Sequence, residues 1–341
     1  MSRAGTQWMC KCLNEHSQAA AFGESMFFGR RYVPPAPDGL YHAAQYRELR
    51  RHLLADGSCI HSTAGGGPGS LKRLTLRDIG PLVERLFPDD APPMTPGACF
   101  RRLARAIAEA EGKPLAIEKT PHHLNWIDRI LAHLPEARFV VMVREPYSFM
   151  LSYKHQGDRK AERVRIAFAR RYHPLAAALI WRASIRTAAD VATRHPDRSL
   201  VTPFDLLRVD AAGTLERVQR FLGLPVEPIA ERVPPDNTSF PGGVRPHLQP
   251  EDLFWMRLIA GRAMRTHGFT PRPTPFAPLR IAWSMLRLPW WAVRNYLDLR
   301  SRVGGSTLGY LWRWLKPGRS ARDETRASPP RSPASPTESS P

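Results

Sequence analysis

The sequence predicts an α/β fold with a mostly parallel β-sheet. Short runs of β-branched and other apolar residues alternate along the chain with longer amphipathic stretches, which is the pattern of repeated βα units. The chain has 341 residues, of which 43% are hydrophobic and 24% charged, so it carries enough apolar material for a sizeable core. We find no internal repeat.

Three segments have the composition of β-strands. They are Leu115–Glu118, Arg138–Val143 and Ser199–Phe204. The middle segment reads Phe-Val-Val-Met-Val after its arginine, which is the composition of a strand buried on both faces of a sheet. We therefore expect both of its faces to be covered by other elements.

Eight further segments have the periodicity and the end signals of helices. They are Thr6–Ser17, Tyr41–Leu54, Leu76–Leu86, Pro96–Glu111, His122–Leu134, Ala176–His195, Ala211–Leu222 and Pro250–Thr266. Glycine and proline predict one flexible loop at Ser62–Gly69 and a second loop at Pro234–Pro250.

The balance of charge is strongly basic. Lysine and arginine together number 50 against 31 aspartate and glutamate residues, a formal net charge of +19, and only seven of the basic residues are lysines. The arginine guanidinium binds phosphate and sulfate with a planar fork of donors, so this excess is compatible with an anionic partner. The alternative is GC-rich coding, which also enriches arginine, alanine and proline.

The cysteine count and the hydropathy exclude several classes of protein. Four cysteines in 341 residues do not make a disulfide framework, and Cys10 and Cys12 are too closely spaced for a usual zinc knuckle, so we expect no metal. No uncharged apolar run reaches the roughly 18 residues of a membrane span. No apolar region of a signal peptide follows the first residues. The expected location is therefore the cytoplasm.

The first residues form a candidate anion-binding turn. A turn of small residues leads into the first predicted helix, and it presents backbone N–H groups and the positive end of the helix dipole to a phosphate or sulfate. Arg3 adds charge and Thr6 a hydroxyl group. The candidate binding residues are Arg3, Ala4, Gly5, Thr6, Gln7 and Trp8. The chain has no G-x-x-x-x-G-K-[ST] Walker A pattern, which argues against a P-loop kinase or triphosphatase.

A second anion-binding element follows the middle strand. Arg144 ends this strand, Pro146 begins a helix, and Ser152 lies two turns along it. An arginine at the carboxyl end of a parallel strand points into the crevice where α/β sheets bind ligands. Arg144 and Ser152 are therefore expected to hold one phosphate together. The alternative is an Arg144 that caps the strand and pairs with Glu145 or Asp158.

Together these two elements resemble the sulfotransferase family, which takes sulfate from 3′-phosphoadenosine 5′-phosphosulfate (PAPS). The first element looks like the family's 5′-phosphosulfate loop, and Arg144-Glu145-Pro146 with Ser152 eight residues after the arginine looks like its 3′-phosphate element. Three further blocks are similar to bacterial and heparan-type members. The five blocks are Ser2–Trp8, Phe22–Phe28, Glu118–Pro121, Arg144–Ser152 and Phe221–Leu224, and the resemblance covers about residues 1–270.

The resemblance implies a fold, a donor and a reaction. The implied fold is a P-loop NTPase-like central parallel sheet flanked by helices, the sulfotransferase fold. The implied donor is PAPS, its product is adenosine 3′,5′-bisphosphate, and no metal is required. The sulfuryl group moves by in-line transfer to a hydroxyl or amine of a glycan, a lipid or a small-molecule acceptor.

Two departures from the family pattern stand out. Gln7 replaces the second threonine of the loop. The family also has a β-strand directly before this loop, whereas only Met1 and Ser2 precede Arg3, so the first strand is expected to be missing. We favour a start codon further upstream. The alternative is a catalytically inactive, membrane-associated binding protein that has lost this strand.

The candidate catalytic residues are Glu24, Lys119 and Arg3. Glu24 follows the first helix in a Phe-flanked setting, where burial would raise its pKa toward that of a general base, and the resemblance places the catalytic carboxylate of heparan-type members here. Lys119 would supply positive charge to the transferring group, and Arg3 would act on the leaving phosphosulfate.

Each of these roles has an alternative. Glu24 can pair with Arg30 or Arg31 on the surface instead, and Lys119 can extend into solvent. Three histidines are alternative bases: His16, His122 and His123.

Two positions later in the chain are weaker candidates. Arg245 lies in a Pro/Gly-bearing loop that could close over the 3′-phosphate, although an ordinary turn is the simpler interpretation. Trp181 is expected in the core rather than on the adenine ring.

The carboxy-terminal region differs in composition from the rest. We expect a domain at 1–271, a basic Trp/Arg-rich helical extension at 272–317 and a disordered Pro/Ser tail at 318–341. Arg280, Arg287 and Arg294 recur every seven residues, and Pro289 is expected to break the helix into two pieces.

The charge and tryptophan of residues 280–316 suggest peripheral contact with an anionic membrane at its inner face. The alternative is a helix pair packed back on the domain with arginine outward. Nucleic acid is not expected as a partner, because no known reading module is present.

Overall fold

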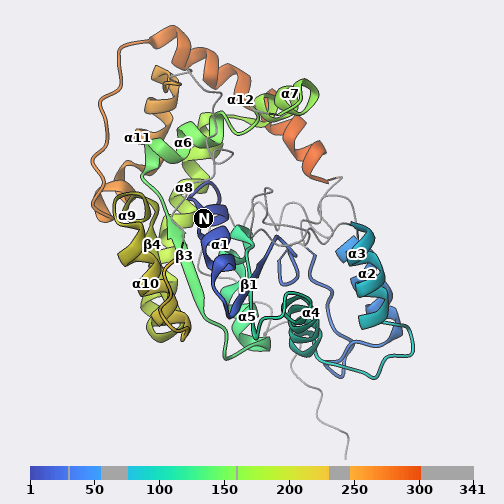
Figure 1. Cartoon of the computed structure of the whole chain (residues 1–341). Coiled ribbons are helices and arrows are strands. Elements are labelled where there is room, and N and C mark those ends of the chain that lie inside the picture. Colours follow the sequence, from blue (N-terminus) through green and yellow to red (C-terminus); the bar gives the residue numbers. More distant parts are fainter. Residues whose placement is uncertain (30, 55–75, 159, 230–245, 301–341) are drawn as a thin grey trace, which may run out of the picture.

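The computed structural model describes residues 1–29, 31–54, 76–158, 160–229 and 246–300 (Figure 1). Its elements in chain order are α1 (Thr6–Glu15), β1 (Ala19–Phe22), α2 (Ala43–Leu54), α3 (Leu76–Leu86), α4 (Pro96–Ala110), β2 (Leu115–Glu118), the 3-10 helix η1 (Pro121–Trp126), α5 (Ile127–His133), β3 (Phe139–Val143), α6 (Pro146–Lys154), α7 (Glu162–Arg171), α8 (Pro174–Arg194), η2 (Pro196–Arg198), β4 (Ser199–Pro203), α9 (Phe204–Val209), α10 (Ala211–Leu222), α11 (Pro250–Thr266) and α12 (Pro278–Arg300). The predicted loop at Ser62–Gly69, most of the one at Pro234–Pro250 and the predicted tail at 318–341 lie outside these residues.

All pairing between the described strands is parallel, as the sequence predicts for an α/β fold. The strands form two separate two-stranded sheets, β1 with β2 and β3 with β4. Ala19 lies opposite Leu115 in the first sheet, and Phe139 lies opposite Ser199 in the second. Within the described part of the chain no strand lies between β2 and β3, so the expected central sheet is divided into two halves.

The strand β1 was not predicted, because its composition is not that of a strand. Its sequence is Ala-Ala-Ala-Phe, without a β-branched residue, and alanine favours helices. All four residues are nonetheless fully buried, and the strand pairs with β2 along its whole length. Tertiary packing therefore overrides the local preference here.

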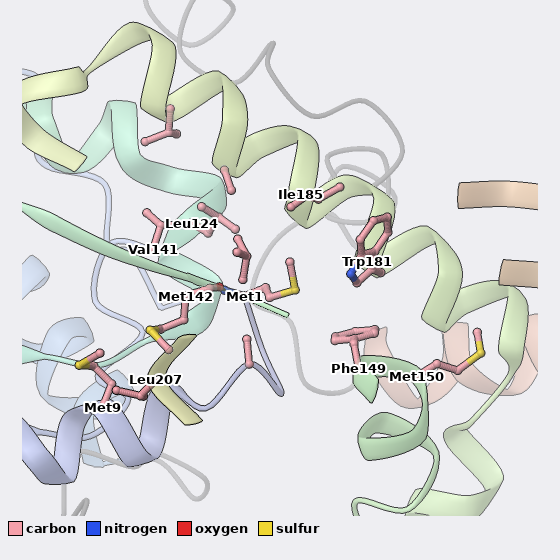
Figure 2. Close-up of a cluster of buried hydrophobic side chains, with 14 of the residues drawn as sticks. Met1, Met9, Leu124, Val141, Met142, Phe149, Met150, Trp181, Ile185 and Leu207 are labelled. Carbon is pink, nitrogen blue, oxygen red and sulfur yellow. The ribbon is translucent and has the colours of Figure 1, made fainter. Parts of the chain in front are cut away.

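Each sheet has its own hydrophobic core. The larger core surrounds β3 and is built from α1, α6, α8 and α11, with Trp181 fully buried in it as expected (Figure 2). The smaller core surrounds β1 and is built from α2, α3 and α4. Phe139 packs against both clusters and is partly buried. The two cores match the division of the sheet.

The helix predictions hold with a few corrections. The predicted helix at His122–Leu134 is divided into η1 and α5. The helices α7 and α9 and the 3-10 helix η2 were not predicted, and α7 has no buried residue.

The helix α12 continues through Pro289, so the predicted break there is wrong. Pro289 and Met285 are both exposed, and water can therefore satisfy the carbonyl that the missing proline N–H leaves free. One side of α12 packs on the domain: Trp255 Nε1 donates to Ser284 Oγ at 2.9 Å, and Trp291 Nε1 donates to the Arg171 carbonyl at 3.2 Å. Among the described helices, none is long and apolar enough to cross a membrane.

Candidate active site

The turn before α1 is held in an uncommon backbone conformation. Arg3 has φ 58° and Gly5 has φ 75°, so both lie in the left-handed region. Such a conformation is strained for arginine and persists only where its surroundings hold it. Gly5 is the N-cap of α1, and no side chain caps the first turn of this helix. The turn thus leaves the positive end of α1 without a side-chain acceptor.

Position 5 has no room for a larger residue. A Cβ atom at Gly5 would lie 2.1 Å from Cδ2 of Phe204, at the start of α9. The same phenylalanine ring packs against Trp8, with the ring centroids 6.0 Å apart, and the Arg144 guanidinium lies 4.7 Å from its centroid. Phe204 therefore fixes the distance between the turn and the end of β3.

The structure brings together three residues that were predicted to bind the donor. Arg3 Nε donates to Ser152 Oγ at 3.1 Å, and Arg144 Nη1 donates to the Arg3 carbonyl at 2.9 Å. The prediction gave Arg3 to the phosphosulfate and the other two residues to the 3′-phosphate. In the structure the three residues form one cluster, the arginine cluster, at the carboxyl end of β3.

The arginine cluster is electrostatically unfavourable without an anion. Burial, followed by repulsion from Arg3, lowers the pKa of Arg144 to about 10, and burial lowers the pKa of Arg3 as well. Arg144 Nε is buried without a hydrogen-bond acceptor. A bound anion would reverse both penalties, because it supplies an acceptor and a negative charge.

The alternative partners of Arg144 are engaged elsewhere. Glu145 accepts a hydrogen bond from the Ser148 backbone N–H at 2.6 Å and so caps α6. Asp158 pairs with His155 at 2.7 Å. The ion-pair interpretation of Arg144 is therefore not the arrangement found.

Glu24 and Lys119, the other two candidate catalytic residues, form an ion pair. Lys119 Nζ donates to Glu24 Oε1 at 2.8 Å, and the two side chains are 16% and 26% exposed, respectively. Of the alternative partners for Glu24, Arg31 donates to the His52 carbonyl, and residue 30 lies outside the described part of the chain. The pair is thus partly shielded but open to a ligand.

A buried carboxylate, which the sequence reasoning missed, holds this pair in place. Glu118 Oε1 accepts from the Ser25 N–H at 2.9 Å, from Ser25 Oγ at 2.8 Å and from Thr120 Oγ1, while Oε2 lies 3.1 Å from His123 Nδ1. Burial disfavours ionisation, but His123 and these hydrogen bonds outweigh it and lower the pKa of Glu118. Because Ser25 follows Glu24 and Glu118 precedes Lys119, this network fixes both ends of the ion pair.

One cavity reaches the first turn of α1 and the end of β2, although neither the arginine cluster nor Glu24 lines it. It has a volume of about 1080 Å³, and Thr6 of the turn, Lys119 and His123 all line it. His123 Nε2 is buried and has no hydrogen-bond partner. Within the described residues no group of histidine, cysteine, aspartate and glutamate has the arrangement of a metal site.

Comparison with known proteins shows the family of this chain. The model of the sulfotransferase family matches residues 1–228. The chain belongs to the sulfotransferase family. Two solved structures are similar: the sulfotransferase domain of the olefin synthase from Synechococcus PCC 7002 (TM-score 0.42, 20% identity, 66% of this chain and 71% of that one) and the sulfotransferase STF9 from Mycobacterium avium (TM-score 0.41, 13% identity, 80% and 76%). A comparison with curated proteins found no match.

The remaining predicted residues of this sulfotransferase lie as follows. Ala4 and Trp8 are buried, and Gln7 is exposed on the first turn of α1. His16 is buried, with its Nε2 2.9 Å from the Pro225 carbonyl, which is a structural role rather than that of a base. Arg245 lies outside the described residues.

Proposed function

We propose that this sulfotransferase uses PAPS and transfers its sulfuryl group to a hydroxyl or amine of a glycan, a lipid or a small-molecule acceptor. The arginine cluster is the observation that carries the proposal. Two arginines are held against each other, one with a buried unpaired Nε, beside a helix N-terminus that no side chain caps. A ligand with several anionic groups explains why such a cluster is kept.

In this proposal the residues of the cluster bind the donor. Arg144 and Ser152 hold the 3′-phosphate, and the turn from Arg3 to Trp8 holds the 5′-phosphosulfate through its backbone N–H groups. Arg3 lies between the two because its carbonyl accepts from Arg144 and its Nε donates to Ser152. No metal is needed, since arginine and the helix dipole supply the positive charge.

The transfer step follows from the ion pair. The donor supplies a sulfuryl group on a phosphate leaving group. Glu24 takes the proton from the acceptor hydroxyl or amine while its oxygen or nitrogen forms the new bond to sulfur. The bond from sulfur to the bridging oxygen breaks, and Arg3 neutralises the charge that develops on the departing phosphate. Lys119 orients Glu24 at 2.8 Å and keeps positive charge beside the transferring group.

Binding of adenosine 3′,5′-bisphosphate tests the proposal directly. Calorimetric titration should give a Kd in the micromolar range or below, and adenosine 5′-monophosphate, which lacks the 3′-phosphate, should bind far more weakly. Transfer of label from PAPS to cell-extract fractions then separates an enzyme from the inactive alternative, which would bind without transfer. Failure of both nucleotides to bind would overturn the proposal.

A specific observation also favours contact with an anionic membrane. We propose that the chain consists of a domain at 1–271 and an extension at 272–317, and that this extension contacts lipid. The outer face of α12 exposes large apolar side chains at helical spacing: Leu279, Trp283, Leu286, Trp290, Val293 and Leu297. Arg280, Arg287 and Arg294 are exposed beside this face. An apolar face flanked by arginine fits an anionic lipid surface.

Cosedimentation with vesicles tests the membrane contact. The full chain should bind vesicles with phosphatidylserine and not vesicles of phosphatidylcholine alone. Trp283→Ser with Trp290→Ser should reduce binding at least tenfold, whereas Leu206→Ser, an exposed apolar residue on α9, should leave it unchanged. Equal binding of all three proteins would contradict the proposal.

A further inference from the structure

The helix α12 is attached to the domain by few buried groups. Of the α12 residues whose burial is described, Ser284 alone is buried. The helix extends from α11 to α7 (Figure 1), and two further contacts lie nearer the surface: Arg280 pairs with Glu251 at 3.6 Å, and Trp291 Nε1 donates to the Arg171 carbonyl at 3.2 Å. A helix that buries so little surface is weakly held, so one buried contact can decide whether it stays docked.

The buried contact of α12 is made by a histidine. His173 is the N-cap of α8 and is 1% exposed. Its Nε2 lies 3.1 Å from the Ser284 carbonyl oxygen, and its Nδ1 accepts from the Leu175 backbone N–H at 3.2 Å. Its ring packs against Trp255 and Trp291, with ring centroids 6.1 and 5.1 Å away. We call His173, Trp255, Ser284 and Trp291 the His173 cluster, which joins α8, α11 and α12.

The backbone partners of His173 fit one protonation state only. A carbonyl can only accept and a backbone N–H can only donate, so Nε2 carries a proton and Nδ1 does not. The ring is therefore neutral in the docked arrangement. A second proton, on Nδ1, would face the Leu175 N–H, remove the cap of α8 and place a positive charge in a buried aromatic cluster.

The surroundings of the ring also disfavour its charged form. Burial lowers the pKa of His173, and repulsion from Arg287 of α12 acts in the same direction. The hydrogen bond that Nε2 donates and the attraction of Asp252 of α11 act against them. Asp252, however, is engaged elsewhere, because it accepts from Lys154 Nζ of α6 and from the Tyr172 hydroxyl, both at 2.6 Å.

We propose that His173 makes the docking of α12 dependent on pH: the helix is held while the imidazole is neutral and is released when the imidazole takes up a proton. The sign follows from linkage. The docked state binds fewer protons than the released state, so the stabilisation is fully present above the usual histidine pKa of 6.5 and is lost as the pH falls through the lowered value. This switch depends on contacts within the chain and not on the proposed donor or acceptor.

Release of α12 would change the surface of the protein and spare the arginine cluster. The helix carries the exposed apolar face described above, and its release would also uncover Trp255, which is 7% exposed when the helix is docked. The hydrogen bonds that join Arg3, Arg144 and Ser152 involve no residue of α12. Nucleotide binding is therefore expected to persist after release.

Hydrogen exchange of the full chain at about pH 7.5 and about pH 5.5 tests the proposal. Protection factors are compared, because the intrinsic exchange rate itself changes with pH. At the lower pH the protection of the α12 amides should fall at least about tenfold, while that of the β3 amides should stay within about twofold. Equal protection of α12 at both pH values, or an equal fall in α12 and β3, would overturn the proposal.

Three variants assign the effect to one side chain. His173→Gln keeps an N–H for the Ser284 carbonyl and cannot take up the proton, so α12 should stay protected at both pH values. His173→Asn is too short to reach this carbonyl, so α12 should lose protection at both. His195→Gln, at the other end of α8, is the matched control and should behave as wild type. A pH response of α12 that persists in both His173 variants would also overturn the proposal.

Discussion

Replacing Arg144 with alanine should weaken ligand binding and leave the free energy of unfolding nearly unchanged. The reason is that burial of this charged side chain destabilises the folded protein. Folding lowers the pKa of Arg144 from its ordinary value to about 10, mainly through burial, and at about 1.4 kcal/mol per tenfold change in the ionisation equilibrium this corresponds to about 3–4 kcal/mol. Both values lie far above pH 7, so the side chain is charged in both states and the full penalty is present there. This penalty would disappear only at a pH above the pKa that Arg144 has in the unfolded chain.

The substitution also removes favourable contacts. Arg144 loses its hydrogen bond to the Arg3 carbonyl, about 1–2 kcal/mol, and its contact with the Phe204 ring, about 1 kcal/mol. The gain and the losses nearly cancel, so we expect the free energy of unfolding to stay within about 1 kcal/mol of wild type. Binding should suffer far more: loss of about 2–3 kcal/mol of charge-assisted hydrogen bonding weakens the Kd about 30- to 150-fold.

Urea unfolding with and without adenosine 3′,5′-bisphosphate measures both quantities. In wild type the ligand should raise the midpoint, and in Arg144→Ala this rise should be lost while the ligand-free midpoint changes little. Arg138→Ala is the matched control and should keep the rise, because Arg138 lies before the opposite end of β3, where it donates to the Phe221 carbonyl and lies over the Phe221 ring. A large loss of ligand-free stability together with a normal ligand response would refute the reasoning.

Three further predictions concern Gly5 in the turn, the proposed base Glu24 and the buried carboxylate Glu118. Gly5→Ala should destabilise the chain by about 2–4 kcal/mol in urea unfolding, because its Cβ would clash with Phe204 as well as strain the backbone; Gly39→Ala, with φ 81° and open space around it, should lose only about 1 kcal/mol, and equal losses would contradict the steric argument. Glu24→Gln should lower kcat about 10²- to 10⁴-fold with unchanged nucleotide affinity, and normal turnover would exclude Glu24 as the base. Glu118 has a lowered pKa, so its stabilising effect is present above the unfolded value and is lost as the pH falls through the folded value; Glu118→Gln should therefore flatten the acid limb of the stability curve, and an unaltered limb would contradict this.

The fold was predictable where local pattern and packing agree. The strand Leu115–Glu118 and the helix Pro250–Thr266 lie where the sequence predicts: the strand pairs with β1 along its whole length, and the helix begins at a proline behind a capping box. Where they conflict, prediction fails. The strand Ala19–Phe22 has helix-forming residues and is extended only because its neighbours bury it. The break at Pro289 was wrong because exposed helices tolerate a missing hydrogen bond.

The sequence predicted which residues belong to the candidate site, but not which of them contact one another. Motif spacing named Arg3, Arg144 and Ser152, yet spacing carries no information on their direct contact across 141 and 149 positions of the chain. Glu118 was missed as a functional residue for a related reason. The sequence identifies Glu118 as part of the Glu118–Pro121 block. Its role, however, depends on hydrogen bonds from Ser25, 93 positions away.

The position of Phe204 makes the two proposed phosphate sites mechanically dependent on each other. Its ring contacts the Gly5 turn on one side and the Arg144 guanidinium on the other, so neither can shift without displacing the ring. A ligand that fills only one half of the site would leave the ring free to move and gain little rigidity. The binding free energies of the two halves of the proposed donor, measured separately, should therefore sum to much less than the binding free energy of the intact donor.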